Sequence, residues 1–267
     1  MNLRIGLLVA FTLLTVGAAV LLPAVPQPLD YHHFADTREA FGIRNFLDVS
    51  SNLAFAIAGI AGLVVTLHPN TSFAHASERW PYGVFFVGVL LTAAGSAYYH
   101  LAPDNETLFW DRLPMTIGFM SLLSAQIVDR INARLGVALL VPLLLVGMAS
   151  VVYWIVTERA GRGNVLPYAA LQAYSVVILV ALAATHPSRY TRGAAIYGVF
   201  AAYVLAKVFE HFDGELLAIG GFISGHSVKH IAAAIGALLV CHMLWKRTLV
   251  VPEARIPVTG KPLHSSP

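Results

Sequence analysis

Residues 135–156 read LGVALLVPLLLVGMASVVYWIV, a run without a single charged side chain. A helix needs about 20 consecutive apolar residues to cross the hydrocarbon core of a bilayer, so this run is long enough. Backbone polar groups find no water in lipid, and segments of this length therefore span it as helices. The sequence predicts an all-α, polytopic membrane helical bundle, with a seven-transmembrane-helix core plus one extra N-terminal transmembrane helix. The other seven apolar runs are Ile5–Leu22, Val49–Leu67, Tyr82–Leu101, Leu108–Ile127, Leu166–Ala184, Ala194–Phe209 and Ser227–Trp245.

The composition excludes several classes of protein. Hydrophobic residues make up 57% of the 267 residues and charged residues only 12%, whereas soluble domains carry about 25% charged residues. The mean hydropathy of +0.71 leaves too few polar side chains to cover a water-soluble globule. A cytosolic enzyme, a disordered protein and a nucleic-acid-binding protein are therefore excluded, and the single cysteine, Cys241, excludes an intramolecular disulfide.

Three regions are expected along the chain. Residues 1–25 form an N-terminal transmembrane helix or signal anchor, residues 26–247 the seven-helix core, and residues 248–267 a disordered cytoplasmic tail rich in proline. The first apolar run also fits a cleaved signal peptide, although it is long for that role and shows no clear cleavage site. A retained helix is the favoured interpretation.

The basic residues predict the orientation in the membrane, because cytoplasmic loops carry an excess of Lys and Arg. One side of the bundle holds ten of them: Arg4, Arg79, Arg130, Arg134, Arg189, Arg192, Lys246, Arg247, Arg255 and Lys261. The other side holds four: Arg38, Arg44, Arg159 and Arg162. The C-terminus is therefore expected in the cytoplasm, and the short loops favour a bacterial inner membrane.

Five polar side chains lie where apolar runs end or begin on the non-cytoplasmic side. Ser96 and His100 close one run and are four residues apart, which places them on one helix face. Asp111 opens the next run, and His226 and His230, again four apart, open the last one. Ionisable groups inside membrane spans are costly, so their agreement in depth predicts a functional site.

The chemistry of these residues fits one zinc ion. Two histidines at i and i+4 can bind one metal from a single helix, and a third from a neighbouring helix completes three protein ligands. Zinc held in this way lowers the pKa of a bound water and polarises a carbonyl. Asp111 is then placed to take the proton of the water, and Ser96 to donate to an oxyanion. The alternative is that each histidine is an interfacial residue or a helix cap.

Further polar groups lie near the same side. Asp111 and Arg112 are adjacent, yet adjacent helical residues point in different directions, so separate partners are expected. Lys207 is expected to pair with an acidic neighbour, and Lys229 to extend its ammonium to the membrane boundary. The polar residues of 30–48 and 210–215 are either solvated loops or a lid or second ion site over the pocket.

These motifs resemble the alkaline ceramidase family, within the superfamily of seven-helix membrane hydrolases that includes the adiponectin receptors. The resemblance covers about residues 48–245. It is carried by Ser51-Asn52-Leu53, Gly95-Ser96 to His100, Asp111 with Leu113-Pro114-Met115, and His226 to His230.

The resemblance implies a function and roles for individual residues. It implies that His100, His226 and His230 bind zinc, that Asp111 acts on the zinc-bound water as general base and acid, and that Ser96 stabilises the oxyanion. The implied reaction is hydrolysis of ceramide, a membrane lipid, to a sphingoid base and a fatty acid.

The sequence departs from the family at several points. Arg112 stands where an acidic residue is expected, and the first helix is additional to the seven-helix core. The family's animal members carry an acidic calcium site before the first core helix, but Asn45 stands here in place of a carboxylate, so calcium is doubtful.

Two other classes of function stay open. The first is a non-catalytic seven-helix lipid receptor or binding protein that keeps a structural zinc. The second is a cofactor protein, with haem between histidines or a retinal on Lys229. If the lipid is not ceramide, another N-acyl lipid must be considered, and the oligomeric state is left open.

Overall fold

The computed structural model describes residues 3–250, with side chains from residue 6 onward. This part of the chain is helical and contains no β-strand, only two isolated bridges. The predicted all-α fold is therefore confirmed. The helices are α1 (Leu3–Leu21), α2 (Phe46–Ser50), α3 (Leu53–Leu67), α4 (Arg79–Leu101), α5 (Asn105–Arg130), α6 (Ala133–Arg159), α7 (Leu166–Thr185), α8 (Ala195–His211), α9 (Asp213–Gly220) and α10 (Gly225–Lys246), with single 3-10 turns η1 (Leu29–His32) and η2 (Ala76–Glu78).

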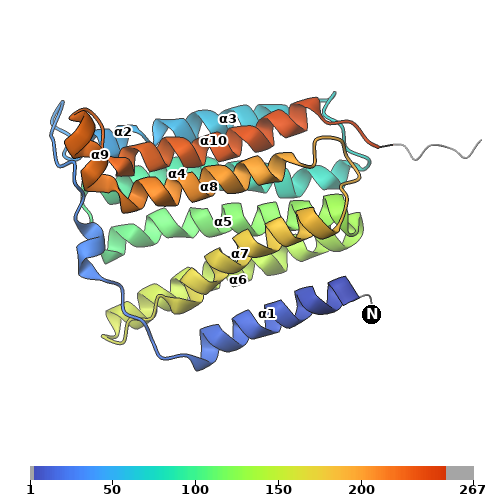
Figure 1. Ribbon diagram of the computed structural model, residues 1–267, viewed down its shortest axis with the longest axis horizontal. Coiled ribbons are helices and arrows are strands. Elements are labelled where there is room, and N and C mark those ends of the chain that lie inside the picture. The colour runs from blue at the N-terminus through green and yellow to red at the C-terminus, as the bar shows by residue number, and fades with distance from the viewer. Residues whose placement is uncertain (1–2, 251–267) are drawn as a thin grey trace, which may run out of the picture.

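The long helices run up and down along one axis (Figure 1). The start of α1 and the end of α10 lie at one end of the bundle, and α2, α9 and the start of α10 lie at the other, here called the α9 end (Figure 1). Among the described residues, five helices are long and apolar enough to cross a membrane, and α8 with α9, bent by 77°, can form a sixth span. The protein is thus a multi-pass membrane bundle, while the predicted number of eight spans stays a prediction.

Helix α5 shows why a count of long apolar helices can miss a helix of the bundle. It is 26 residues long but is not among the helices counted as apolar spans. It packs against α4, α6 and α7, and it buries polar side chains such as Gln126 and Asp129 inside the protein. Because its neighbours shield it, α5 does not need the apolar surface that a lipid-facing helix requires.

Capping residues in the sequence determine where helices α5 and α10 begin. Asp104 caps α5, and its carboxylate accepts a hydrogen bond of 2.7 Å from the Thr107 amide. Ser224 caps α10, and its hydroxyl accepts a hydrogen bond from the Ser227 amide. These caps place Asp111 near the start of α5 and His226 in the first turn of α10.

Two glycines allow helices to approach closely at the α9 end. A Cβ atom on Gly95 of α4 would lie 2.0 Å from the Trp110 carbonyl oxygen of α5. A Cβ on Gly225 of α10 would lie 2.1 Å from the Phe209 carbonyl oxygen of α8. Side chains do not fit at such distances, so glycine is required for both contacts.

The opposite end of the bundle is closed by a buried ion pair. Arg247 Nη1 donates to Asp129 Oδ2 at 3.0 Å, and the Tyr82 hydroxyl donates to the same oxygen at 2.7 Å. Residues 248–250, which we expected to begin a disordered tail, instead form hydrogen bonds with residues 189–191, including Val250 N to Arg189 O at 2.8 Å. The anchored Arg247 brings this segment against the loop, and this part of the prediction is wrong. The rest of that tail, residues 251–267, lies outside the described residues.

The extra helix α1 lies at the edge of the bundle (Figure 1) and contacts α7. Its Thr12 hydroxyl is 2.9 Å from the Tyr174 hydroxyl, and the Phe11 ring stacks on the Tyr174 ring at 5.8 Å. The helix is thus additional to the core, as predicted, and whether it is removed by cleavage stays open.

Candidate metal centre and cavity

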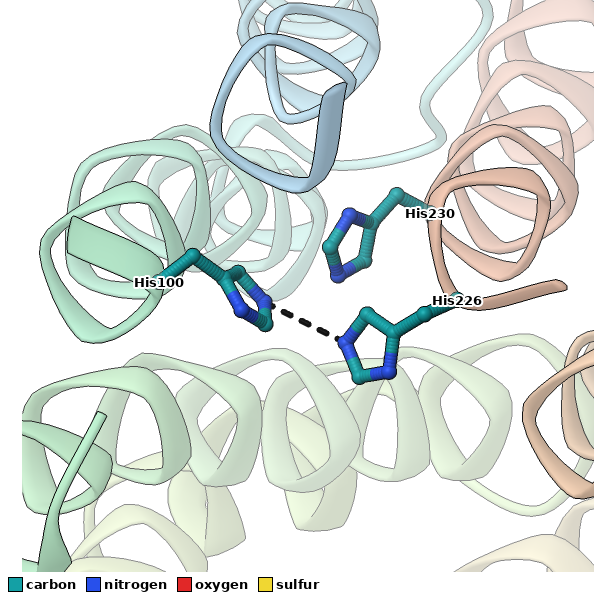
Figure 2. A group of neighbouring side chains, drawn as sticks. All are labelled: His100, His226 and His230. Atoms are coloured by element: carbon teal, nitrogen blue, oxygen red, sulfur yellow. Dashed lines mark hydrogen bonds between the residues drawn. The ribbon is translucent and has the colours of Figure 1, made fainter. Parts of the chain in front are cut away.

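The three predicted histidines come together at the α9 end. Figure 2 shows the imidazole of His100, from the end of α4, facing those of His226 and His230, from the first two turns of α10. Each offers a ring nitrogen, and these atoms all lie within 4.8 Å of one another. The three residues are at most 5% exposed. Among the described residues, no other group of histidine, cysteine or carboxylate side chains converges in this way.

The geometry of this group fits a tetrahedral zinc ion. His100 Nε2 and His226 Nε2 are 3.3 Å apart. Two nitrogens bound to one tetrahedral zinc at about 2.0–2.1 Å must lie about 3.3–3.4 Å from each other. The same contact is compatible with a hydrogen bond between the two rings when one Nε2 carries a proton (Figure 2). The residues therefore fit a metal ion held by three histidines.

Polar groups around the histidines orient the rings. Ser51 Oγ lies 2.8 Å from His230 Nδ1, which leaves Nε2 of that ring facing the common point. Asp48, fully buried, accepts hydrogen bonds from the hydroxyls of Ser227 at 2.6 Å and Ser224 at 3.2 Å, both in the first turn or cap of α10. Such surrounding hydrogen bonds fix the orientation of ligands and tune the metal.

The segment of residues 34–38, which precedes α2, lies against the histidines. The ring of Phe34 packs edge-on against His226 at 4.5 Å and His100 at 4.7 Å between ring centres. Asp213 connects this segment to α10, because its Oδ2 accepts from the Ala35 amide at 2.9 Å and its Oδ1 from the His226 amide at 2.7 Å. This segment therefore packs against the histidines, and its role as a lid over the pocket stays a prediction.

An ion pair fastens the same segment to the loop after α9. Arg38 binds both carboxylate oxygens of Asp36, at 2.8 and 2.7 Å, and donates to the carbonyl oxygens of Gly221 and Phe222. This guanidinium holds the pKa of the Asp36 carboxyl below its usual value. Asn45 stands in place of a carboxylate of the family's calcium site, and its side-chain amide donates to the His100 carbonyl oxygen at 2.8 Å. Asp36 and Asn45 are thus occupied by protein partners.

A cavity of about 430 Å³ extends from the histidines into the bundle. His230, Ser96 and Asp111 line it at the α9 end, and Leu122 and Leu179 line it further in. From Asp111 to Leu122 the wall follows α5 for about 16 Å. Ser96 is close enough to Asp111 to form a side-chain hydrogen bond with it. All five predicted site residues therefore lie at one end of the bundle, and three of them line the cavity.

Three charged residues on this cavity wall behave differently from one another. Lys207 Nζ bonds Glu210 Oε2 at 2.6 Å, which confirms that Lys207 pairs with an acidic neighbour. Lys229, which was expected to extend its ammonium to the membrane boundary, bonds Glu210 Oε1 at 2.6 Å and lines the cavity. Arg112 and Asp111 have separate partners, as predicted: Arg112 Nη2 donates to the Gln27 amide oxygen at 2.7 Å.

Sequence reasoning missed several groups that the site uses. Phe34 was not singled out, Asp48 and Asp213 were considered only as solvated loops or as a lid or second ion site, and Ser51 was noted only within a family motif. Their signal was weak, because the contacts of Ser51, Asp48 and Phe34 with α10 join positions more than a hundred residues apart. The polar character of residues 30–48 was the one usable sign.

Comparisons with family models and with curated proteins were made for this chain. No family model matches it, and no curated protein matches it. The interpretation therefore depends on the residues and geometry described above.

Proposed function

We propose that the protein is a zinc-dependent intramembrane lipid amidase, which hydrolyses the amide bond of ceramide-like lipids to a sphingoid base and a fatty acid. The observation that carries the proposal is the position of the three buried histidines at the head of an apolar cavity whose wall also holds Ser96 and Asp111. A metal alone would fit many functions. A metal beside a general base, a hydroxyl donor and a lipid-sized cavity favours hydrolysis of a lipid.

Each residue of the site has its own role in the proposed reaction. A zinc ion held by His100, His226 and His230 supplies Lewis acidity to a water and a carbonyl oxygen. Asp111 accepts a proton from the attacking water, whose oxygen adds to the acyl carbon, and passes a proton to the amide nitrogen as the C–N bond breaks. The Ser96 hydroxyl donates to the oxyanion that develops on the carbonyl.

The bundle supplies the remaining requirements. Apolar residues such as Leu122, Phe119 and Val176 line the inner part of the cavity and suit the hydrocarbon chains of the substrate. Phe34 packs against the rings of His100 and His226 and gives them an apolar neighbour. From the distribution of Lys and Arg, we propose that the site lies at the non-cytoplasmic face and the C-terminus in the cytoplasm. The short loops favour a bacterial inner membrane.

The first test is zinc content and ceramide hydrolysis of the detergent-purified protein beside His226→Ala. We expect about one zinc per chain in the wild type, lost together with activity in the variant. His242→Ala is the matched control, because His242 is an exposed histidine of the same helix outside the metal group. Hydrolysis that persists in a zinc-free His226→Ala protein contradicts the proposal.

The second test separates an enzyme from a receptor. Asp111→Asn is expected to keep its zinc and to lose turnover by roughly 10²–10⁴-fold, as typical for removal of a general base. Unchanged turnover would remove Asp111 from the mechanism. Zinc and lipid binding without hydrolysis of any lipid amide would instead indicate a receptor with a structural zinc.

A further inference from the structure

The charges on the cavity wall do not balance. Among the described residues, those lining the cavity include three cations and two carboxylates. Glu210 is shared by two lysines, so that triad keeps one positive charge. Asp111 contributes the second negative charge of the wall. The formal charge of the wall is therefore +1 before any metal binds. The charged residues are Asp111, Arg112, Lys207, Glu210 and Lys229.

Arg112 is the cation without an acidic partner. It is 5% exposed, forms no ion pair among the described residues, and its Nη1 has no hydrogen-bond partner. Its guanidinium carbon lies 4.4 Å from the Trp154 ring centre, 4.9 Å from that of Tyr168 and 5.4 Å from that of Tyr31. The aromatic rings fix its orientation without neutralising it. A buried charge without a counterion is costly, so Arg112 is a candidate for binding an anionic ligand.

Tyr31 joins this arginine to the lysine pair. Its ring contacts Arg112, and its hydroxyl lies 3.4 Å from Glu210 Oε1, the oxygen that also binds Lys229. The residues therefore surround one polar region of the cavity beside His230 and Asp111. This region lies next to the point where a substrate amide would meet the metal.

We propose that this region binds a carboxylate of the lipid headgroup, so that the substrate is an N-acyl lipid with an acidic headgroup, such as an N-acyl amino acid. The inference rests on the proposed amidase function and narrows its substrate class. An arginine fork matches a carboxylate in shape and charge. The cavity wall carries a net positive charge before a metal binds, and a zinc ion held by the histidines would add to it, so an anionic headgroup is favoured.

The test compares two lipids that differ only at this group. N-palmitoyl serine carries a carboxylate where N-palmitoyl serinol carries a hydroxymethyl group. With the zinc-loaded full-length protein in detergent, we expect kcat/KM to favour N-palmitoyl serine by roughly 10- to 100-fold, the usual effect of one hydrogen bond to a charged group. Equal rates, or faster hydrolysis of the serinol lipid, overturn the proposal.

Variants assign the preference to the cavity wall. Arg112→Gln is expected to remove most of the preference by slowing N-palmitoyl serine more than it slows the serinol lipid. Lys207→Met, at a half-exposed position that tolerates substitution, is expected to weaken it less. The matched control is Arg159→Gln, which removes a positive charge at the same end but outside the cavity. An equal loss of preference in Arg159→Gln would contradict the assignment.

Binding measurements separate this inference from the proposed function. If neither lipid is hydrolysed, displacement of a fluorescent fatty amide still reports affinity, and tighter binding of N-palmitoyl serine supports the carboxylate site while the amidase fails. Palmitate tests whether the site holds the product carboxylate instead. If Arg112→Gln weakens palmitate binding and leaves N-palmitoyl serine binding unchanged, the headgroup assignment is wrong.

Discussion

The contact between α4 and α5 predicts the effect of a single methyl group. In Gly95→Ala the new Cβ would lie 2.0 Å from the Trp110 carbonyl oxygen, and side chains do not approach backbone closer than about 3.0 Å, so the helices must separate by about 1 Å. Asp111 follows Trp110 directly and moves with it. A misplacement of about 1 Å at reacting groups can cost on the order of 10²-fold in rate.

We therefore expect Gly95→Ala to keep its zinc but to lose about 100-fold in kcat. The histidines are on α4 and α10, which both pack against α3, whereas the displaced Asp111 is on α5. Overpacking of this kind also lowers the free energy of unfolding by roughly 1–3 kcal/mol. Metal analysis, a single-turnover assay and thermal unfolding in the same detergent measure the three effects.

A second glycine of α4 supplies the control. No atom lies within 4 Å of the position that a Cβ would take on Gly83, so the methyl group of Gly83→Ala meets no obstacle. This variant is expected to leave zinc and turnover unchanged, with stability equal or higher by up to about 1 kcal/mol from helix propensity. Full turnover in Gly95→Ala would refute the requirement for a close approach of Asp111. Loss of zinc together with turnover would show that α4 moves instead, which also contradicts the reasoning.

Two further predictions concern the surroundings of the site. Ser51→Ala removes the partner of His230 Nδ1 and should weaken zinc binding by about 10- to 100-fold, measured by competition with a chelator, and unchanged affinity would exclude an orienting role. The Arg38 guanidinium lowers the pKa of Asp36, so this pair stabilises the fold above the unfolded carboxyl pKa of about 3.9, and the contribution is lost as the pH falls through the lower folded value. Melting temperatures between about pH 6 and pH 3 should therefore fall more steeply in the wild type than in Asp36→Asn, and parallel curves would contradict this.

Much of the architecture was predictable because its causes are local. The apolar run at residues 135–156 lies within α6, and the other runs each fall on one observed helix, except that Val49–Leu67 covers the end of α2 and all of α3. The i, i+4 spacing of His226 and His230 follows from helix geometry alone. The meeting with His100 followed from counting spans, since an even number of crossings between two helix ends returns the chain to the same side.

The contacts around the site were not predictable, because they join distant parts of the chain. Phe34 lies in irregular chain and reaches the histidines only through tertiary packing. Ser51 and Asp48 contact α10 across nearly 180 positions, and no periodic pattern marks such pairs. The ordered residues 248–250 were missed because proline and polar residues indicate disorder in general, while the anchoring ion pair of Arg247 is specific to this fold.

The two ends of the bundle provide an internal comparison for the charged cavity. Each end buries an arginine among aromatic rings: Arg247 lies 4.0 Å from the Tyr190 ring centre, and Arg112 lies 4.4 Å from that of Trp154. Arg247 also has the carboxylate of Asp129 at 3.0 Å, so its charge is neutralised and it holds the end of α10 in place. Arg112 has equivalent aromatic contacts but no carboxylate among the described residues. The fold supplies a carboxylate for the buried Arg247. The missing carboxylate at Arg112 therefore does not mean that this fold tolerates buried charges in general. It is the difference expected when the missing carboxylate is brought by a ligand.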